Sequence, residues 1–244
     1  MNKGLYEASE EGTPQGGPLS PLLSNIMLNE LDKELERREF SFVCYADDSM
    51  VFCKSKRAAM RVKESITRFI DNTLYLKVNK EKTVVSYVRG VKYLGYSFYV
   101  MKGKCQLAVH PKSKAKIKSR LKDLTSRSNG WGYAKRKQRL KEYIRGWGGY
   151  YHLANMKRLL LVTDEWLRRR IRMCIWKAWK KVKTKVANLI RCGINEYQAY
   201  EWGNTRKGYW RIADSPVLTR AINNNNLRSA GYATLMDAYL EWYP

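Results

Sequence analysis

The sequence has only two histidines, His110 and His152, among its 244 residues. Neither a histidine-based metal cluster nor a catalytic triad can be assembled from so few. Its five cysteines are an odd number, and none of them lies in a Cys-x-x-Cys spacing. This pattern excludes a disulfide framework and a cysteine-based zinc site, and it predicts a reducing compartment.

Long apolar runs are missing as well. No stretch of the sequence reaches the roughly 20 apolar residues that a membrane-spanning helix needs. The N-terminal segment 1–17 has no apolar core and does not resemble a signal peptide. We therefore expect no membrane partner and a cytoplasmic location.

Acidic residues are few, and the imbalance is uneven along the chain. The whole sequence has 47 Lys and Arg against 22 Asp and Glu, a net charge of +25. Residues 1–100 carry 15 basic against 13 acidic side chains, whereas residues 101–244 carry 32 against 9. A nearly neutral half followed by a strongly basic half indicates a catalytic module joined to a nucleic-acid-binding module. A solvated basic surface and an anionic membrane surface are the alternatives.

Two adjacent aspartates interrupt an apolar stretch at residues 41–53, SFVCYADDSMVFC. The pattern predicts two strands joined by a tight turn, with Asp47 and Asp48 at its tip. An ordinary β-turn is one interpretation, because aspartate favours turns. Two carboxylates beside a buried hairpin repel each other unless a cation lies between them. Mg²⁺ prefers carboxylate oxygens and leaves positions for water and phosphate, so the pair is a candidate site for nucleotidyl transfer.

A second motif lies about thirty residues before the aspartate pair. It consists of Pro14, Gln15, Gly16 and Gly17. The two glycines allow backbone to approach a ligand closely, and the amide of Gln15 can bond to a sugar or a base edge. A plain connecting turn is the alternative interpretation.

The remaining pattern predicts an α+β fold. Ser20 is expected to cap a helix with an apolar stripe from Leu22 to Leu35, and a second helix is expected at 56–72. Residues 91–100 are expected to form a strand, with its return at 101–110. Beyond Pro111 the periodicity is helical throughout, and Thr163 is expected to cap one long helix at 162–193.

Seven segments, in this order along the chain, carry a resemblance to a known family. They are TPQGGPLSPLLSNIMLNELD, FVCYADD, VNKEKT and YLGYSF, followed by IRGWGGYYHLA, RRRIRMCIWKAWKKVKT and WGNTRKGYWRIADSPVL. Together they resemble the reverse transcriptases encoded by group II introns, of the bacterial type without an endonuclease domain. The resemblance implies part of a palm, with antiparallel strands and helices, followed by an all-α basic thumb or maturase domain.

The resemblance also implies roles for individual residues. Asp47 and Asp48 match the metal-binding pair and are catalytic with Lys82, which faces the nucleotide triphosphate. A surface lysine is the alternative interpretation of Lys82. Nucleotide and template binding is implied for Pro14, Gln15, Gly16, Gly17, Tyr45 and Ala46. The primer grip is implied for Leu94, Gly95 and Tyr96, although a glycine within a strand often marks only a bulge.

Basic residues interleaved with aromatic ones predict an RNA-binding surface in the helical part, through phosphate neutralisation and base stacking. A core position is the alternative for the aromatic residues. The predicted contacts are Lys135, Arg136, Arg139, Arg145, Tyr150, Tyr151, Arg168, Arg169 and Arg172.

One element of the family pattern is not found. The family's third catalytic carboxylate comes from a palm strand upstream of the Pro-Gln-Gly-Gly loop, and Asp32 lies downstream of that loop. We therefore expect an N-terminally truncated chain that is inactive as a polymerase alone. An upstream palm and fingers fragment, or a second copy of the chain, is the expected protein partner.

The expected organisation is a partial palm at 1–108, a thumb or maturase-specific domain at 109–195, and a basic, aromatic extension for DNA or RNA at 196–244. The expected function is RNA-directed DNA polymerase and intron maturase of a mobile element, with Mg²⁺ as cofactor. Expected partners are the intron RNA, a DNA target and primer, and deoxynucleoside triphosphates, in a bacterial nucleoprotein. A non-catalytic RNA-binding splicing factor and a remnant without function are the alternatives.

Overall fold

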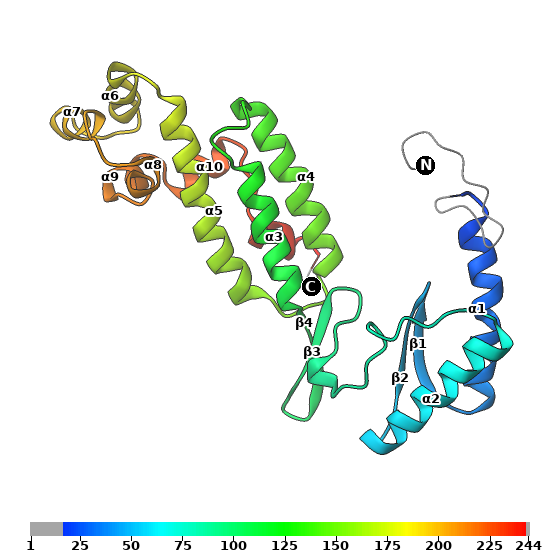
Figure 1. The fold of residues 1–244 in the computed structure, drawn as a ribbon. Coiled ribbons are helices and arrows are strands. Elements are labelled where there is room, and N and C mark those ends of the chain that lie inside the picture. The colour runs from blue at the N-terminus through cyan, green and yellow to red at the C-terminus, as the bar shows by residue number, and fades with distance from the viewer. Residues whose placement is uncertain (1–16, 243–244) are drawn as a thin grey trace. The chain divides into compact units, whose positions relative to one another are not determined.

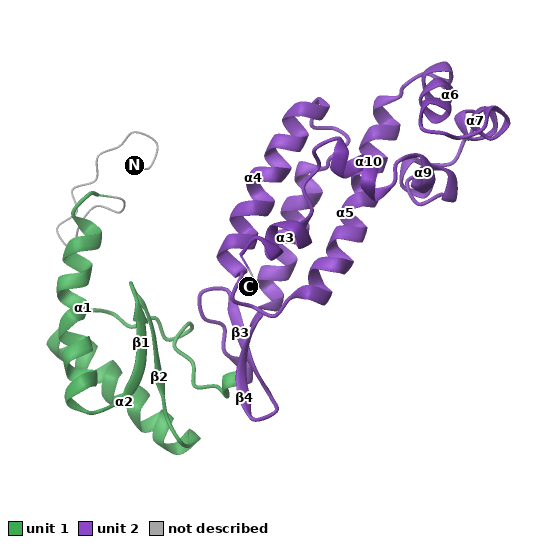
Figure 2. Cartoon of the chain, turned by 180° about the vertical axis from the view of Figure 1, so that it is seen from behind, with its two compact units in different colours: residues 1–88 green, residues 89–244 purple. Residues whose placement is uncertain are grey.

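A computed structural model describes residues 17–242 of the chain. The chain separates into two compact units, residues 1–88 and 89–244 (Figure 2). The first unit contains two helices and a two-stranded antiparallel sheet (Figure 1). Its elements are α1 Ser20–Arg37, β1 Ser41–Tyr45, β2 Asp48–Phe52 and α2 Lys56–Thr73.

The hairpin and the second helix confirm the sequence-based prediction for this unit. Ser55 adopts extended backbone, and its hydroxyl accepts a hydrogen bond from the backbone N–H of Ala58 at 3.2 Å, which starts α2. Leu31, Leu35 and Leu74 are buried and form a small core. One face of the hairpin packs on this core through Phe42, Cys44 and Val51.

The expected first helix is present, but the expected cap at Ser20 is wrong. Helix α1 already includes Ser20, and Leu19 precedes it without a side-chain cap. The apolar stripe of α1 is buried only at its end, because Leu22, Leu23, Ile26 and Met27 are exposed. The outer face of the hairpin is likewise open at Val43, Tyr45 and Phe52. The first unit therefore presents an uncovered apolar surface.

The second unit begins with a hairpin and continues as a helical bundle. After a short 3₁₀ turn at Val88–Gly90 come β3 Tyr96–Met101 and β4 Lys104–Val109. The predicted strand and its return are therefore confirmed. Three long helices follow, α3 Pro111–Leu124, α4 Tyr133–Tyr151 and α5 Lys157–Ala178 (Figure 1).

The C-terminal part consists of short helices. They are α6 Val182–Arg191, α7 Glu196–Gly203, α8 Tyr209–Ile212, α9 Pro216–Ala221, α10 Asn224–Ser229 and α11 Leu235–Leu240. Buried side chains from these helices join those of α3, α4 and α5 in one hydrophobic core. The hairpin β3–β4 and the C-terminal helices thus belong to the same compact unit as the bundle.

Asp164 shows how the C-terminal helices are fixed to the bundle. It is 2% exposed, and its carboxylate accepts hydrogen bonds from the backbone N–H groups of Leu235 and Met236 at 2.8 and 2.9 Å. A negative charge at the start of α11 stabilises that helix end. Burial raises the pKa of Asp164, and the two backbone bonds oppose this shift.

The predicted single helix at 162–193 is wrong in two respects. Helix α5 starts at Lys157, so Thr163 lies inside it and donates its hydroxyl to the carbonyl of Leu159 at 2.7 Å. The helix then ends at Ala178, because Trp179 has a ψ of 66° and leaves helical geometry. None of the helices within residues 17–242 has the length and apolar character of a membrane span.

Candidate active site and nucleic-acid interface

The aspartate pair lies on a two-residue turn between β1 and β2. Tyr45 pairs with Asp48, which leaves Ala46 and Asp47 as the central residues. Ala46 has a φ of 50°, in the left-handed region that side chains rarely adopt. A positive φ at the first central residue matches the hairpin turns whose twist suits the flanking strands. The turn therefore places two consecutive aspartates at one end of the hairpin.

Both carboxylates face solvent, as do Tyr45 and Ala46. Mg²⁺ is commonly bound through one or two carboxylates together with substrate phosphates, and this donor set fits that requirement. Within residues 17–242, no cluster of three or more Asp, Glu, His or Cys side chains surrounds a common point. Burial raises the pKa of the Cys44 thiol to about 12, and the hydrogen bond that this thiol donates to the carboxylate of Asp32 adds to the shift.

Lys82 belongs to the same unit as the aspartate pair. Its loop is shaped by Asn79, whose side-chain oxygen accepts the backbone N–H groups of Glu81 and Lys82, both at 3.1 Å. Lys63 of α2 holds the loop by donating to the carbonyl of Thr83 at 2.7 Å. The Lys82 side chain is exposed, as a phosphate-facing lysine requires.

The predicted nucleotide-binding loop is described only at its last residue. Pro14, Gln15 and Gly16 lie outside the described residues. Gly17 is half-buried, and its carbonyl accepts a hydrogen bond from the N–H of Ser20 at 3.2 Å, just before α1.

The predicted primer grip forms a second tight turn, in the second unit. Tyr93 and Tyr96 exchange two backbone hydrogen bonds, at 3.1 and 2.8 Å. Between them, Leu94 and Gly95 have φ values of 48° and 81°. Positive φ at both central residues is the signature of a type I′ turn.

This turn contacts two residues that sequence reasoning placed in a different site. The hydroxyl of Tyr150 donates to the carbonyl of Leu94 at 3.0 Å, and that of Tyr96 donates to the carbonyl of Tyr150. The Tyr96 ring lies 5.2 Å from the ring of Tyr151, and burial raises the pKa of Tyr96 to about 12. The primer-grip turn and the end of α4 are therefore one aromatic cluster. No local pattern indicates a contact across more than fifty residues of chain.

We expect Gly95→Ala to destabilise the second unit more than Gly103→Ala does. Both glycines have a positive φ, which costs an alanine about 1–2 kcal/mol. A Cβ at Gly95 would also lie 2.3 Å from the hydroxyl of Tyr151, whereas at Gly103 nothing lies within 4 Å. Denaturant unfolding of the two variants measures the difference. Equal losses of unfolding free energy would contradict the close packing of this turn on α4.

The arginine-rich run of α5 is mostly engaged within the protein. Arg172 is buried and donates to the carbonyl of Ile222 at 3.0 Å. Arg170 donates to the carbonyls of Lys122 and Thr125 at 3.0 Å and so caps the end of α3. These arginines stabilise helix ends that lie far away in sequence.

Two other predicted RNA contacts are also held by the protein. Arg169 pairs with Asp214 at 3.0 Å, and Arg136 of α4 is buried and bonded to Asn129 at 3.1 Å. With Arg136 and Arg172 buried, a nucleic-acid surface has to consist of the exposed cations. Lys135, Arg139 and Arg145 are exposed, although Arg139 and Arg145 pair with glutamates at 3.3 and 3.7 Å.

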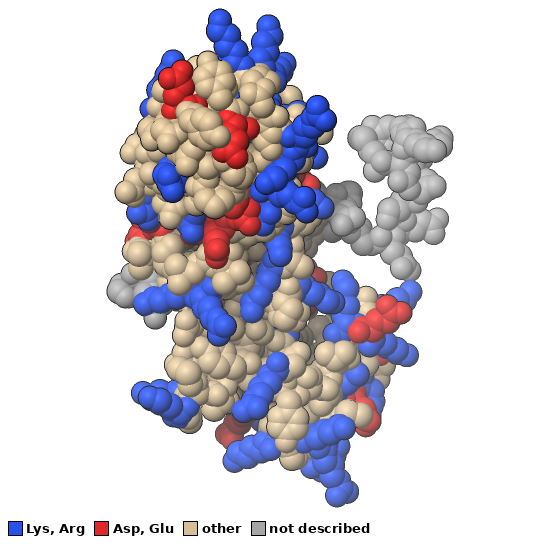
Figure 3. Space-filling model, turned by 90° about the vertical axis from the view of Figure 1, so that its left-hand side faces the viewer, with Lys and Arg blue, Asp and Glu red and all other residues tan. Residues whose placement is uncertain are grey.

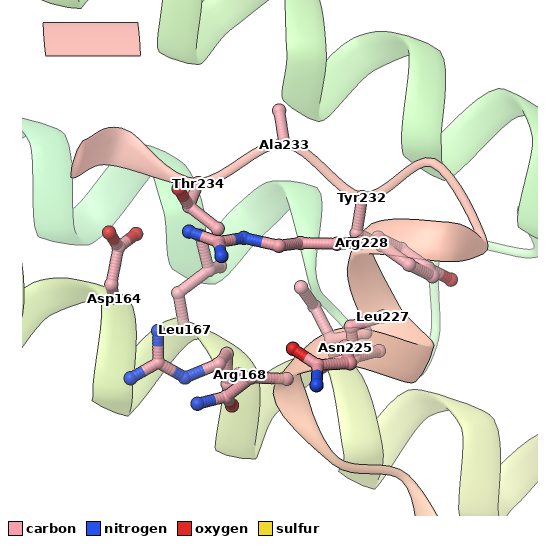
Figure 4. A pocket seen from close by; sticks show the side chains of 11 residues that line it. Asp164, Leu167, Arg168, Asn225, Leu227, Arg228, Tyr232, Ala233 and Thr234 are labelled. Atoms are coloured by element: carbon pink, nitrogen blue, oxygen red, sulfur yellow. The ribbon is translucent and has the colours of Figure 1, made fainter. Parts of the chain in front are cut away.

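Arg168 lies on a pocket of about 170 Å³ between α5, α10 and the segment before α11. Arg168 and Arg228 both extend along this pocket toward Asp164 (Figure 4). Arg228 pairs with Asp237 at 2.7 Å, and Asp164 is bonded to α11. Among the charged side chains that line this pocket, Arg168 therefore forms the fewest hydrogen bonds and ion pairs within the described residues.

Helix α3 carries the largest set of exposed cations without ion pairs in the described residues. All of them project from the helix surface while Ile117 and Leu121 are buried beneath. Three occupy one flank at a spacing of four residues and three occupy the other. The first flank holds Lys112, Lys116 and Arg120, and the second holds Lys114, Lys118 and Lys122. One face of the molecule, with many basic and few acidic side chains, is shown in Figure 3.

The chain matches two described protein families in succession. Residues 2–98 match the reverse transcriptase (RNA-dependent DNA polymerase) family. Residues 114–193 match the group II intron maturase-specific domain.

Curated proteins also match part of the chain. Protein YkfC of Escherichia coli (strain K12) is 31% identical over 131 residues, which covers 39% of this chain and 34% of the relative. The group II intron-encoded protein LtrA of Lactococcus lactis subsp. cremoris is 27% identical over 160 residues, covering 39% of this chain and 27% of that protein. The chain thus spans about a third or less of the length of these relatives.

Proposed function

Because the chain belongs to the family of group II intron reverse transcriptases and maturases, we propose that it binds the RNA of a group II intron and assists its splicing. We further propose that its first unit contributes to RNA-directed DNA synthesis. The observation that carries the first proposal is the set of exposed cations on α3, a helix that overlaps the region matching the maturase-specific domain from residue 114 onward. A bacterial cytoplasmic nucleoprotein is the setting that this function implies.

RNA binding follows from the chemistry of these side chains. Lysine and arginine neutralise phosphates and release condensed counterions, which favours binding without reading the sequence. Lys135, Arg139, Arg145 and Arg168 extend the same charge onto α4 and α5. Tyr150, at the end of α4, is 53% exposed.

For DNA synthesis, Asp47 and Asp48 are the residues that would hold Mg²⁺. The metal would supply charge stabilisation at the phosphates of an incoming deoxynucleotide. Lys82 is exposed in its loop, and its ammonium group would neutralise the leaving pyrophosphate. Leu94, Gly95 and Tyr96 would support the primer end. The apolar surface on α1 and the hairpin is where an upstream palm and fingers fragment, or a second copy of the chain, would pack.

A splicing factor that does not polymerise is the second candidate. The observation that favours it is that the described residues bring no third acidic side chain to Asp47 and Asp48. Two metal ions in a polymerase site need carboxylates from more than one strand. Primer extension by the chain completed with an upstream palm and fingers segment distinguishes the two candidates, because a splicing factor that does not polymerise would extend no primer even then.

We expect the chain to bind a folded group II intron transcript with a steep dependence on salt. The logarithm of the association constant should fall with the logarithm of salt concentration by about 0.7–0.9 for each neutralised phosphate. Filter binding over a series of salt concentrations measures this slope, with a transfer RNA as a structured comparison. Absence of binding at low salt, or a slope near zero, would contradict the proposed function.

A further inference from the structure

A shallow groove lies between α3 and α5 and is bordered by α8. Its walls carry Lys118 and Lys122 from α3, Trp166 and Arg170 from α5, and Trp210 from α8. The groove has a volume of about 510 Å³, and none of the described acidic side chains lines it. Two indoles and three cations thus share one surface.

The indoles are held in place by cations of the protein itself. The guanidinium of Arg169 lies 4.0 Å from the ring centroid of Trp210, and that of Arg170 lies 5.3 Å from the ring of Trp166. Such contacts are attractive because a cation meets the negative face of the ring. Trp210 nevertheless remains 39% exposed. A fixed and partly exposed aromatic ring can receive a second flat group with little loss of conformational entropy.

The cations of the groove differ in whether they form hydrogen bonds within the protein. Arg170 is bound to the end of α3 through Lys122 and Thr125. The ammonium groups of Lys118 and Lys122 have no ion pair or hydrogen bond within residues 17–242, and Lys118 only approaches the ring of Trp166 at 5.5 Å. The small side chains of Ala115 and Ser119 also line the groove and keep it open between the helices.

Building on the proposed RNA-binding function, we propose that this groove binds unpaired nucleotides of RNA. One base stacks on the exposed part of Trp210, and the neighbouring phosphates are neutralised by Lys118 and Lys122. The bases of a duplex have both faces covered by their neighbours, so only unpaired nucleotides offer a free face to an indole. Stacking on aromatic rings tolerates any base, since every base has a π face. The groove therefore selects single-stranded segments of a folded RNA rather than a particular sequence.

The test compares two RNA probes and three variants of the full chain. The probes are a short single-stranded oligoadenylate and an RNA duplex of the same length. Trp210→Ala should weaken binding of the single strand by about 5- to 100-fold, the range measured when one stacking partner is lost, and leave duplex binding nearly unchanged. Trp210→Phe should retain most of the affinity, because a phenyl ring still stacks. Tyr197→Ala is the matched control, since Tyr197 is 81% exposed on α7 and does not line the groove.

The possible outcomes distinguish an error in the groove proposal from an error in the proposed RNA-binding function. If Trp210→Ala binds the single strand as tightly as the parent, or loses affinity equally for both probes, the groove does not hold unpaired nucleotides. If the parent binds neither the probes nor an intron transcript, the proposed RNA-binding function itself is wrong. Binding of an acidic peptide that depends on Trp210, without binding of the oligoadenylate, would assign the groove to a protein partner and overturn the proposal.

Discussion

Replacing Lys112, Lys116 and Arg120 by glutamine should weaken binding to a group II intron transcript by about 10²–10³-fold at about 0.1 M salt. Each substitution would remove one phosphate contact. At about 0.1 M salt, each lost contact lowers the logarithm of the association constant by roughly 0.7–0.9. The three side chains share one flank of α3, are exposed, and make no ion pair in the described structure. They also lie outside the groove of Trp166 and Trp210. Their loss therefore tests the cationic helix alone.

A matched variant separates local contact from net charge. Lys181, Lys183 and Arg191 are exposed at or near α6, and their replacement by glutamine removes the same charge. Exposed charges are screened beyond about 10 Å at this ionic strength, so the α6 variant should lose little affinity. Both variants should unfold within about 0.5 kcal/mol of the parent, because they change surface positions without partners. Equal losses of affinity would mean that RNA responds only to overall charge.

Asp47→Ala and Asp48→Ala should each abolish DNA synthesis, by about 10³-fold or more, in the chain completed by an upstream palm and fingers segment. Each substitution removes one of the two adjacent carboxylates that would hold Mg²⁺. Asp71→Ala is the matched control, because Asp71 is exposed on α2 and distant in sequence from the turn. We expect the 244-residue chain alone to show no extension of a primed RNA template.

Metal binding at the turn has a readout independent of activity. With Fe²⁺ in place of Mg²⁺, added hydrogen peroxide and ascorbate should generate hydroxyl radicals at the bound iron and cleave the backbone beside Asp47 and Asp48 in the 244-residue chain, and Asp47→Ala should suppress this cleavage. Synthesis that survives Asp47→Ala in the completed enzyme would contradict the metal assignment. Robust extension by the 244-residue chain alone would contradict the need for a further carboxylate.

Local patterns predicted the elements whose causes are local. The hairpin at 41–53 and the helix at 56–72 follow from strand alternation, a two-residue turn and the serine cap at Ser55. Helix α3 follows from Pro111 and the spacing of Ile117, Leu121 and Leu124. In each case the residues that decide the structure lie within a few positions of one another.

Features decided by distant neighbours were not predictable in this way. Nothing local distinguishes Arg172, which is buried against Ile222, from Arg168, which lines a pocket. The same holds for Thr163, because α5 starts upstream of it at Lys157 without a side-chain cap, and Leu160 in its first turn is buried in the core. The apolar residues at the start of α1 have the spacing of a buried stripe, yet no described element covers them.

The candidate site also contains features that local patterns predict and features that depend on contacts between distant residues. The Asp47–Asp48 turn was predictable from its flanking strands, whereas the contact between Leu94 and Tyr150 joins residues 56 positions apart. Tyr150 and Tyr151 therefore support the primer-grip turn in addition to any role in binding RNA.

The most direct measurement of the central claim is the salt dependence of intron RNA binding by the α3 variant beside that of the parent. Loss of three phosphate contacts at Lys112, Lys116 and Arg120 should make the slope of log K against log salt shallower by about 2–3. The α6 variant at Lys181, Lys183 and Arg191 should keep the parental slope. An α3 variant with the parental slope would show that these cations do not meet RNA phosphates, and it would contradict the assignment of α3 as the RNA-binding surface.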